Sequence, residues 1–323
     1  MQFSSLLILL FCLAALGPEG SLWAQAPYYI HDMSRVSEAD RATIDSLIPA
    51  KAPTDPQKPR KLLVYDVNAS YGGHGAIMYA NYALEQMGKR TGAFELVRST
   101  DSKVFEKESL AQYDAVFLNN IVGTPFEDEK LYANIVEFVK NGGGLMGVHG
   151  TTAAFLYWGQ GWPAKDMFPE FGQMIGGRGA QHRTQDERIH IRIDDPANPI
   201  TKMFPADGFD WQGEFFRFPT IYSREKLRVL MSIDVEKSGT LADPKFRPER
   251  PDNDYGIAWI QKYGQGRVFY SSLAHSKQEF LDARLLEFYL AAVQYVLGDL
   301  KVDDSSTASV SSSPKPSASS MQK

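Results

Sequence analysis

The chain has almost no cysteine: Cys12 is the single one among 323 residues. Cys12 lies in an apolar run near the amino terminus, and Leu10-Phe11 before it are unlike the small residues that precede a lipoprotein cysteine. We expect this run to be removed, which would leave a mature chain with neither a disulfide nor a thiol nucleophile. A chain of this size can fold without disulfides because its core is large enough.

Basic residues and nucleotide-binding motifs are also scarce. The 34 Lys and Arg residues are outnumbered by 39 Asp and Glu residues, so the net charge is −5 at pH 7. Nucleic acids and anionic membranes require a basic face, so we expect neither as a partner. The sequence has no GxxxxGK followed by Ser or Thr, and no GxGxxG opens a helix after the first predicted strand. We therefore expect no nucleotide cofactor.

Residues 1–26 have the pattern of a secretory signal peptide. The run from Leu6 to Leu16 is apolar, shorter than a membrane-spanning helix usually is, and followed by Gly17-Pro18. Ala24-Gln25-Ala26 is a small-x-small site, so we predict cleavage after Ala26 and no stable membrane span afterwards. The protein would then be exported, to the periplasm or the medium. The alternative is an uncleaved anchor, because MQFSS carries no Lys or Arg.

The rest of the chain divides into three parts. Residues 27–60 form an N-terminal arm, with a helix from Ser37 to Leu47 capped by Ser37 and a proline-rich linker over 49–59. Residues 61–299 form the compact domain. Residues 300–323 form a Ser- and Pro-rich tail with too few apolar residues to fold, which we expect to be disordered.

The compact domain alternates strands with helices. LLVYDV, its first strand, is apolar along its length, as expected of a strand buried on both faces. Helices are predicted over 74–88, 127–141 and 281–297, and the later strands are FELVRS, YDAVFLNN, LMGVH, RIHIRID, RVLMSID, YGIAWIQ and GRVFYSS. This order predicts an α/β fold with a doubly wound, mostly parallel sheet and helices on both faces.

Four of the six histidines lie where a predicted strand meets a glycine or small-residue turn. They are His74, His149, His182 and His275. Open α/β sheets place their chemistry at such strand ends, so we predict that the four approach one pocket as a metal or acid/base centre. Each could instead simply end a strand. His190 falls within a strand and is interpreted as structural, and His31 receives no role.

Other candidate residues accompany the histidines. Glu214 lies among aromatic residues in FDWQGEFFRF and is either an exposed edge-strand residue or a buried acid/base group or ligand. Trp158, Trp162 and Trp211 lie in segments that would border the pocket, where they could stack on sugar rings or belong to the core. His149 occupies the position of a nucleophile elbow, so covalent catalysis by Ser or Cys is not expected there.

Five blocks of sequence resemble the ThuA-like (trehalose utilisation) proteins. In chain order they are GGGLMGVHGTTAAF, GGRGAQHRTQ, ITKMFP, GEFFRF and YGQGRVFYSSLAHS, and the resemblance extends from about residue 61 to 298. It implies a flavodoxin-like fold of the class I glutamine amidotransferase-like type. Members usually have Asp where this chain has Gly213. The amidotransferase relatives have Cys at the elbow, so glutaminase activity does not carry over.

The resemblance also implies a function. The family is linked to sugars oxidised at C3, such as 3-keto-disaccharides, and to a divalent metal. We therefore expect an enzyme that acts on a keto-sugar or glycoside by elimination, isomerisation or hydrolysis. The alternatives are a non-catalytic carbohydrate-binding protein with a degenerate site, and a scaffold whose arm and tail recruit a partner.

Each candidate residue receives a role under the enzyme hypothesis. Zinc is the first metal expected, because nitrogen-rich ligation with one carboxylate suits a borderline ion. The expected metal ligands are His74, His182 and His275. The expected catalytic groups are His149, Glu214 and His182. The expected sugar-binding residues are Trp158, Trp162, Trp211 and Arg183.

Overall fold

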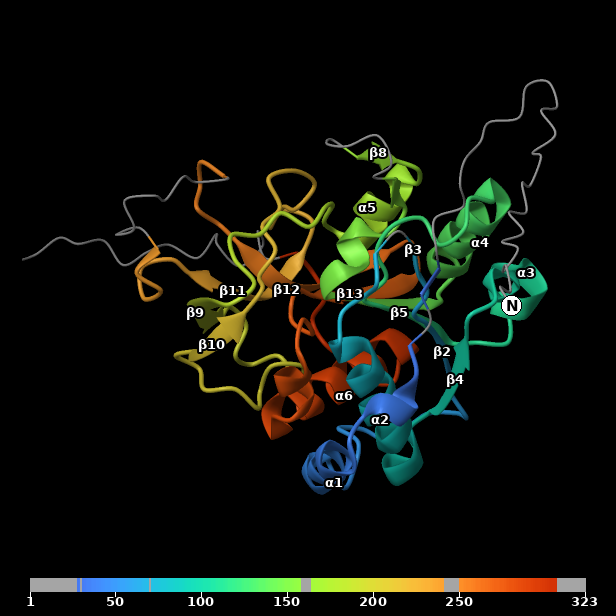
Figure 1. The fold of residues 1–323 in the computed structure, drawn as a ribbon, viewed down its shortest axis with the longest axis horizontal. Coiled ribbons are helices and arrows are strands. Elements are labelled where there is room, and N and C mark those ends of the chain that lie inside the picture. The colour runs from blue at the N-terminus through green and yellow to red at the C-terminus, as the bar shows by residue number, and fades with distance from the viewer. Residues whose placement is uncertain (1–27, 30, 70, 158–163, 241–249, 307–323) are drawn as a thin grey trace, which may run out of the picture.

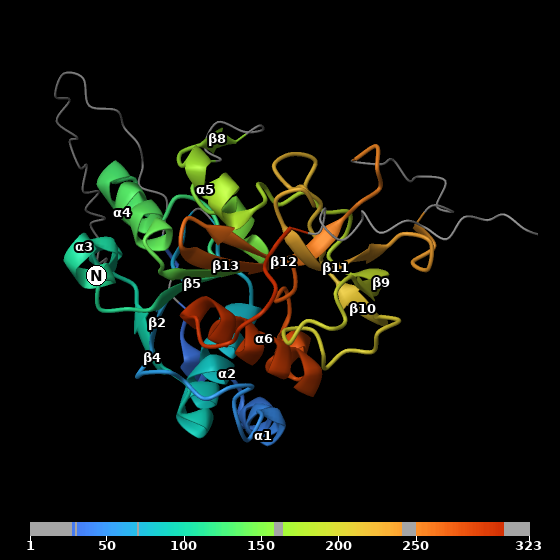
Figure 2. The same ribbon diagram turned by 180° about the vertical axis from the view of Figure 1, so that it is seen from behind.

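The protein is seen here as a computed structural model that describes residues 28–29, 31–69, 71–157, 164–240 and 250–306. One nine-stranded sheet runs through its centre, with helices on both faces (Figures 1 and 2). The predicted signal peptide, Trp158, Trp162 and the tail from residue 307 lie outside the described residues. Within the described residues, no helix is both long and apolar enough to cross a membrane.

Five parallel strands form one half of the sheet. Their order is β4-β2-β5-β6-β13, which is the 2-1-3-4-5 order of flavodoxin-like folds when the strands are counted along the chain. All except the edge strand β4 are buried over nearly their whole length. Their bounds are β2 Lys61–Tyr65, β4 Glu95–Ser99, β5 Ala115–Asn119, β6 Gly144–Val148 and β13 Gly266–Ser271.

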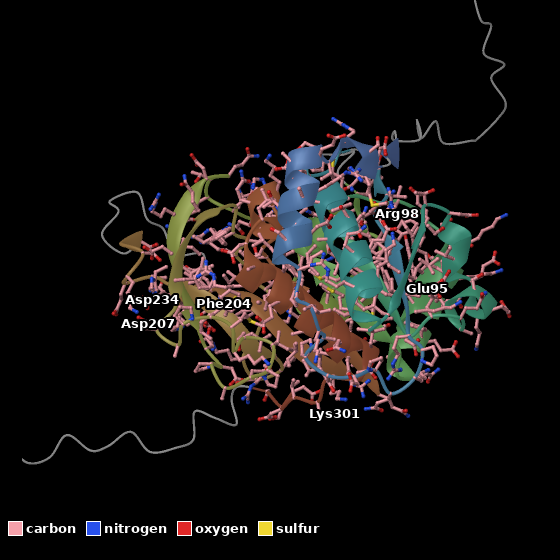
Figure 3. All side chains as sticks on the ribbon, turned by 90° about the horizontal axis from the view of Figure 1, so that it is seen from below. Glu95, Arg98, Phe204, Asp207, Asp234 and Lys301 are labelled. Carbon is pink, nitrogen blue, oxygen red and sulfur yellow. The ribbon has the colours of Figure 1, made fainter. Side chains whose placement is uncertain are left out.

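Four antiparallel strands extend the sheet beyond β13 in the order β12-β11-β9-β10. Their bounds are β9 Glu187–Ile193, β10 Phe209–Gly213, β11 Arg228–Asp234 and β12 Gly256–Tyr263. The predicted α/β fold with its mostly parallel sheet is confirmed, and β10 is an additional edge strand. In Figure 3, Phe204 and Asp207, just before β10, lie at the opposite end of the molecule from Glu95 and Arg98 of β4.

Helices cover the two faces because neighbouring residues of a strand point to opposite sides. Leu62 and Val64 of β2 pack in one apolar cluster with the helices of the first face, and Leu63 packs in another with those of the second. The first face carries α1 Glu38–Leu47, α2 Ala76–Thr91 and α6 Ala283–Leu297 (Figure 1). The second carries α4 Glu129–Lys140 and α5 Pro169–Ile175, with the short α3 Lys107–Leu110 nearby.

The N-terminal arm is attached to the domain by hydrogen bonds. The side chain of Ser37 accepts a hydrogen bond from the backbone N–H of Asp40, so Ser37 is the cap of α1 that the sequence predicts. Two hydroxyls of α2 reach this helix: Tyr79 donates to Asp40 at 2.7 Å and Tyr82 donates to Asp45 at 2.9 Å. The arm therefore packs against α2.

The remaining elements are short. They are β1 Tyr28–Tyr29, β3 Asn68–Ala69, β7 Leu156–Tyr157, β8 Lys165–Asp166 and the 3₁₀ helices Met33–Arg35, Ser102–Phe105, His149–Ala153 and Lys277–Phe280. Residues 300–306, which the sequence assigns to the tail, contact the domain. Leu300 is buried, Asp303 pairs with Arg228 at 3.1 Å, and Asp304 accepts a hydrogen bond from Tyr295 at 3.1 Å.

Candidate metal and catalytic site

The sheet brings the candidate residues to one edge. His74, His149 and His275 follow β2–β3, β6 and β13, whose carboxyl ends all lie at this edge. Glu214 follows β10, which points the same way. His182 precedes β9, which runs the opposite way, so the start of β9 lies there too. Four of the five, namely His74, His149, Glu214 and His275, each place a potential ligand atom within 4.8 Å of the others.

Glu214 lies at the centre of the group and is buried. Its Oε1 lies 3.3 Å from His149 Nε2, and its Oε2 lies 3.6 Å from His182 Nδ1 and 3.8 Å from His275 Nε2. Burial opposes ionisation of this carboxyl, but the contact with His149 and the other imidazoles outweighs it and lowers the pKa of Glu214. Glu214 is therefore a buried carboxylate, as one of the two sequence-based alternatives has it, and not an exposed edge-strand residue.

His149 is held at the elbow after β6. Its backbone has φ 42°, a left-handed conformation that is uncommon for a non-glycine residue. Its side chain is fully buried, stacks on Phe216 with ring centroids 4.3 Å apart, and donates from Nδ1 to the carbonyl of Ser272 at 2.8 Å. Because a carbonyl can only accept, Nδ1 carries a proton. Nε2 therefore faces Glu214 as a donor when the ring is protonated and as a lone pair when it is neutral.

Two acceptors that face each other at 3.3 Å repel unless a cation or a proton lies between them. His149 Nε2 is a buried atom without a hydrogen-bond partner, and the same holds for Nδ1 of His74 and Nδ1 of His275. His275 faces Glu214 with its other nitrogen, Nε2, at 3.8 Å. Three imidazoles and one carboxylate gathered in this way form a donor set that suits a divalent metal. Ligands at about 2.1 Å from a tetrahedral ion are about 3.4 Å apart, close to the separation of His149 and Glu214.

His74 is built into the site by the turn before it. Gly73 has φ 77°, and a Cβ there would lie 2.4 Å from Cε1 of His31, so only glycine fits. His31, in the arm, is buried and lies 3.2 Å from the amide of Asn68. Burial, followed by the nearby His149, lowers the pKa of His74 to about 2, so His74 is neutral and able to ligate at physiological pH.

Asn120, which the sequence reading places only in a predicted strand, joins two of the site's turns. Its Oδ1 accepts a hydrogen bond from the N–H of Gly150 at 2.8 Å, and its Nδ2 donates to the carbonyl of Ala274 at 2.9 Å. Asn120 and Ala274 both have positive φ, 59° and 85°. The sequence could have indicated Asn120, because it is a polar residue directly after a buried strand, at the point where the strand order of the sheet reverses and ligands commonly bind.

Tyr71 and His182 border the site on the solvent side. Tyr71 is 41% exposed, and its ring lies 5.1 Å from that of His74. The side chain of His182 is 33% exposed, so it can meet a molecule that arrives from solvent. Arg183, next to it, and Trp211, on β10, are both half-buried. His190 lies away from this group, where Nδ1 contacts Asp210 and Nε2 contacts the carbonyl of Asp207, in keeping with a structural role.

A buried ion pair clamps the two loops that carry Glu214 and His182. The guanidinium of Arg217 is fully buried and donates to both carboxylate oxygens of Glu187, at 2.7 and 2.9 Å. The backbone N–H of Arg217 donates to the carbonyl of Gln181 at 2.7 Å. Neither residue was identified from the sequence, because a charged pair distant in the chain leaves no local pattern.

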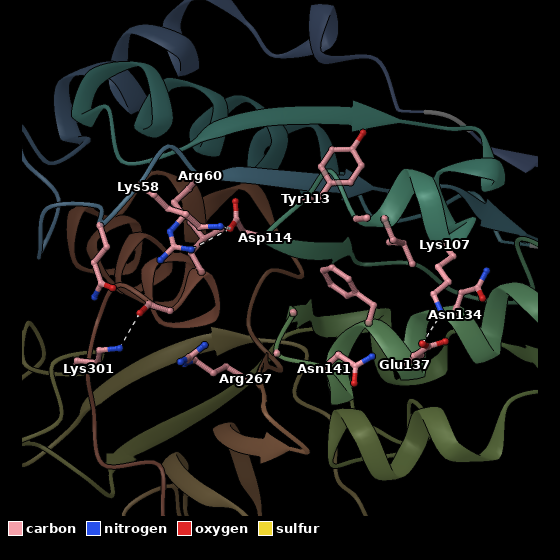
Figure 4. A pocket seen from close by; sticks show the side chains of 18 residues that line it. Lys58, Arg60, Lys107, Tyr113, Asp114, Asn134, Glu137, Asn141, Arg267 and Lys301 are labelled. Carbon is pink, nitrogen blue, oxygen red and sulfur yellow. Dashed lines mark hydrogen bonds and ion pairs between the residues drawn. The ribbon is translucent and has the colours of Figure 1, made fainter.

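A separate cavity of about 510 Å³ opens at the amino ends of the parallel strands, the edge opposite the histidines (Figure 4). Most of its cations already have carboxylate partners. Arg60 pairs with Asp114 and Asp299, and Lys107 pairs with Glu137. Because it opens at the opposite edge of the sheet, this cavity is not part of the histidine site.

Comparisons with known proteins agree with this architecture. The chain is similar in structure to a ThuA-like protein from Bacteroides uniformis, with 19% identity, a TM-score of 0.57, and 80% of this chain and 98% of that chain covered. A ThuA-like protein from Parabacteroides merdae gives 17% identity, a TM-score of 0.52, and 76% and 92% coverage. At these identities the likeness shows the fold alone. A search of the curated proteins finds no match.

Family membership comes from the sequence. The family model described as ThuA, trehalose utilisation, matches residues 61–296, which is most of the chain and the whole of the sheet. The matched range contains His74, His149, His182, Glu214 and His275. We conclude that this protein belongs to the ThuA family.

Proposed function

We propose that this protein is an exported, divalent-metal-dependent enzyme that acts on a keto-sugar or a keto-glycoside. The observation that carries the proposal is the approach of His149 Nε2 to Glu214 Oε1 at 3.3 Å, with Nδ1 of the same ring already bonded to Ser272. That arrangement is favourable when a metal ion or a proton is shared between the two side chains, and the nearby His74 and His275 supply the further ligands that a metal ion needs.

The residues would divide between binding the ion and moving protons. His74, His149, His275 and Glu214 would hold the ion, which would have to take a sugar carbonyl as a fifth ligand to polarise it as a Lewis acid. This geometry favours a ligand role for Glu214, whereas the sequence-based hypothesis makes it the general base. His182 is the residue left to act as acid and base, because it is exposed and lies 3.6 Å from Glu214 Oε2, which can orient its ring.

The reaction that fits a sugar oxidised at C3 is β-elimination. The C3 carbonyl acidifies the C–H bond at C2, and His182 takes that proton. The electron pair released forms a double bond between C1 and C2, and the bond from C1 to the glycosidic oxygen breaks. The departing oxygen receives the proton from His182, so the base is regenerated and the glycoside is cleaved without water.

A panel of 3-keto-glycosides, incubated with the purified protein with and without a chelator, tests the proposal. We expect turnover that the chelator abolishes and that added zinc or another divalent ion restores. In the His182→Gln variant we expect metal content to persist while turnover falls by about 10²–10⁴-fold. Sugar binding without turnover, unaffected by the chelator, would instead identify a carbohydrate-binding protein. Export is tested by the mass of the secreted protein, which should begin at residue 27.

A further inference from the structure

A cleft of about 540 Å³ lies beside the histidine site, along the edge strand β10. It is bounded by the loop that leads into β9, by β10 itself and by the turn after β13. The cleft and the site share His275, and Gly213 of the cleft immediately precedes Glu214. A volume of this size is within the usual range for small-molecule pockets.

The cleft presents hydrogen-bonding groups that the protein itself does not use. The side chains of Asp186, Arg188 and Gln278 line it, and none of them makes a hydrogen bond or ion pair with another described residue. Together they offer carboxylate acceptors, guanidinium donors and an amide that does both. Trp211, on β10 and packed in part against the apolar core, adds the exposed part of its indole.

This combination fits a neutral, polyhydroxylated ring. A sugar hydroxyl donates and accepts at once, so it can use carboxylate and guanidinium groups together, and its C–H face can pack on an indole. The lining also includes Asp210, so its two carboxylates outnumber its one guanidinium and would repel a phosphate. An apolar ligand would leave the same polar groups without water or partners.

His275 lines both the cleft and the histidine site, so a ligand that extends from the cleft can reach the site at this residue.

We propose that this cleft is a second saccharide subsite, which holds the glycosyl unit on the far side of the bond that is broken. The inference rests on the proposed function, since it assigns the oxidised ring to the histidine site. It makes the substrate a disaccharide or longer glycoside, with the oxidised unit over the histidines and the next unit against Trp211. A monosaccharide glycoside would use the histidine site alone.

Binding to the intact protein tests the subsite without depending on turnover. Calorimetry would compare a 3-keto-disaccharide with methyl 3-keto-glucoside for the native protein and for Asp186→Asn and Trp211→Phe. Asp186→Asn keeps the size of the side chain, and Trp211→Phe keeps an aromatic ring of smaller area. Asp207→Asn, on the connection between β9 and β10 and outside the cleft, is the matched control (Figure 3).

We expect the disaccharide to bind at least 10-fold more tightly than the methyl glycoside. Asp186→Asn should weaken disaccharide binding by about 10-fold, as for loss of one hydrogen bond to a charged group. Trp211→Phe should weaken it by about 3-fold. Neither should alter binding of the methyl glycoside, and Asp207→Asn should change neither ligand.

The outcomes separate the two proposals. Equal affinity for both ligands, or disaccharide binding that the two cleft variants leave unchanged, overturns the subsite even if the enzyme turns over. Selective, cleft-dependent binding without turnover supports the subsite and counts against the proposed reaction. No binding of either ligand overturns both.

Discussion

Removing the guanidinium of Arg217, which links the two loops that carry Glu214 and His182, should destabilise the protein. Arg217→Met keeps an apolar stem of similar length but leaves Glu187, whose side chain is only 14% exposed, without its bidentate partner. Breaking a buried ion pair from one side costs about 3–5 kcal/mol, because the remaining charge stays desolvated. For a domain of this size that corresponds to a fall in Tm of about 6–20 °C.

Urea unfolding followed by circular dichroism would measure this loss of unfolding free energy. Arg192→Met is the matched control, because Arg192 lies on β9 in a pair with Asp194 and its side chain is 48% exposed. An exposed pair contributes less than about 1 kcal/mol. The double variant Arg217→Met with Glu187→Gln should recover part of the loss, since it removes the stranded charge.

The ion pair does not hold the two loops if Arg217→Met costs less than about 1 kcal/mol, or no more than Arg192→Met. The same follows if the double variant is less stable than the sum of the single changes predicts. Either result would mean that solvent reaches Glu187 when Arg217 is removed, so that the pair is not needed to hold the two loops.

Three further results are expected. Glu214→Gln should reduce bound metal from about one equivalent to less than about a tenth, measured by elemental analysis of protein purified without a His tag, and retained metal would contradict the ligand role. His149→Ala should lose turnover and also about 1–3 kcal/mol of stability, because its fully buried ring is hydrogen-bonded to Ser272, whereas unchanged stability would show that the elbow tolerates the cavity. The metal-free protein should lose unfolding free energy as pH falls below 6.5, by about 1.4 kcal/mol per pH unit from His74. The reason is that His74 takes up a proton at pKa 6.5 in the unfolded chain but only near 2 in the native protein. A His74→Gln variant with the same pH dependence of stability in urea titrations would refute this.

The parallel half of the sheet could be predicted from the sequence because its strands are buried on both faces. Runs such as LLVYDV and YDAVFLNN are apolar throughout and lie between clear helical patterns. β10 was predicted only as an alternative, because Asp210 and Gln212 alternate with Phe209 and Trp211 over only five residues, and the stretch is followed by more aromatic residues. A short edge strand has too few residues to establish a period of two.

The histidines could be identified from the sequence, but their division of roles could not. Each follows or precedes a strand, and a sheet edge is a local property that the pattern contains. The separation of His149 from Glu214 depends on the register of β10 against β9 and on the left-handed turn at residue 149, which are tertiary properties. The sequence therefore places His182 among the ligands, whereas the structure leaves it at the rim and brings His149 into the group.

The four members of the ligand group are far apart along the chain, from His74 to His275, and each lies on a different turn. An ion held by all four would connect the loops after β3, β6, β10 and β13 as a cross-link, in a domain that contains no cysteine with which to form one. Such a link closes loops of tens of residues at once and shifts the folding equilibrium by mass action. If the protein is exported as we propose, beyond the reach of cytosolic chaperones, occupancy of the site would then set resistance to unfolding and proteolysis as well as activity.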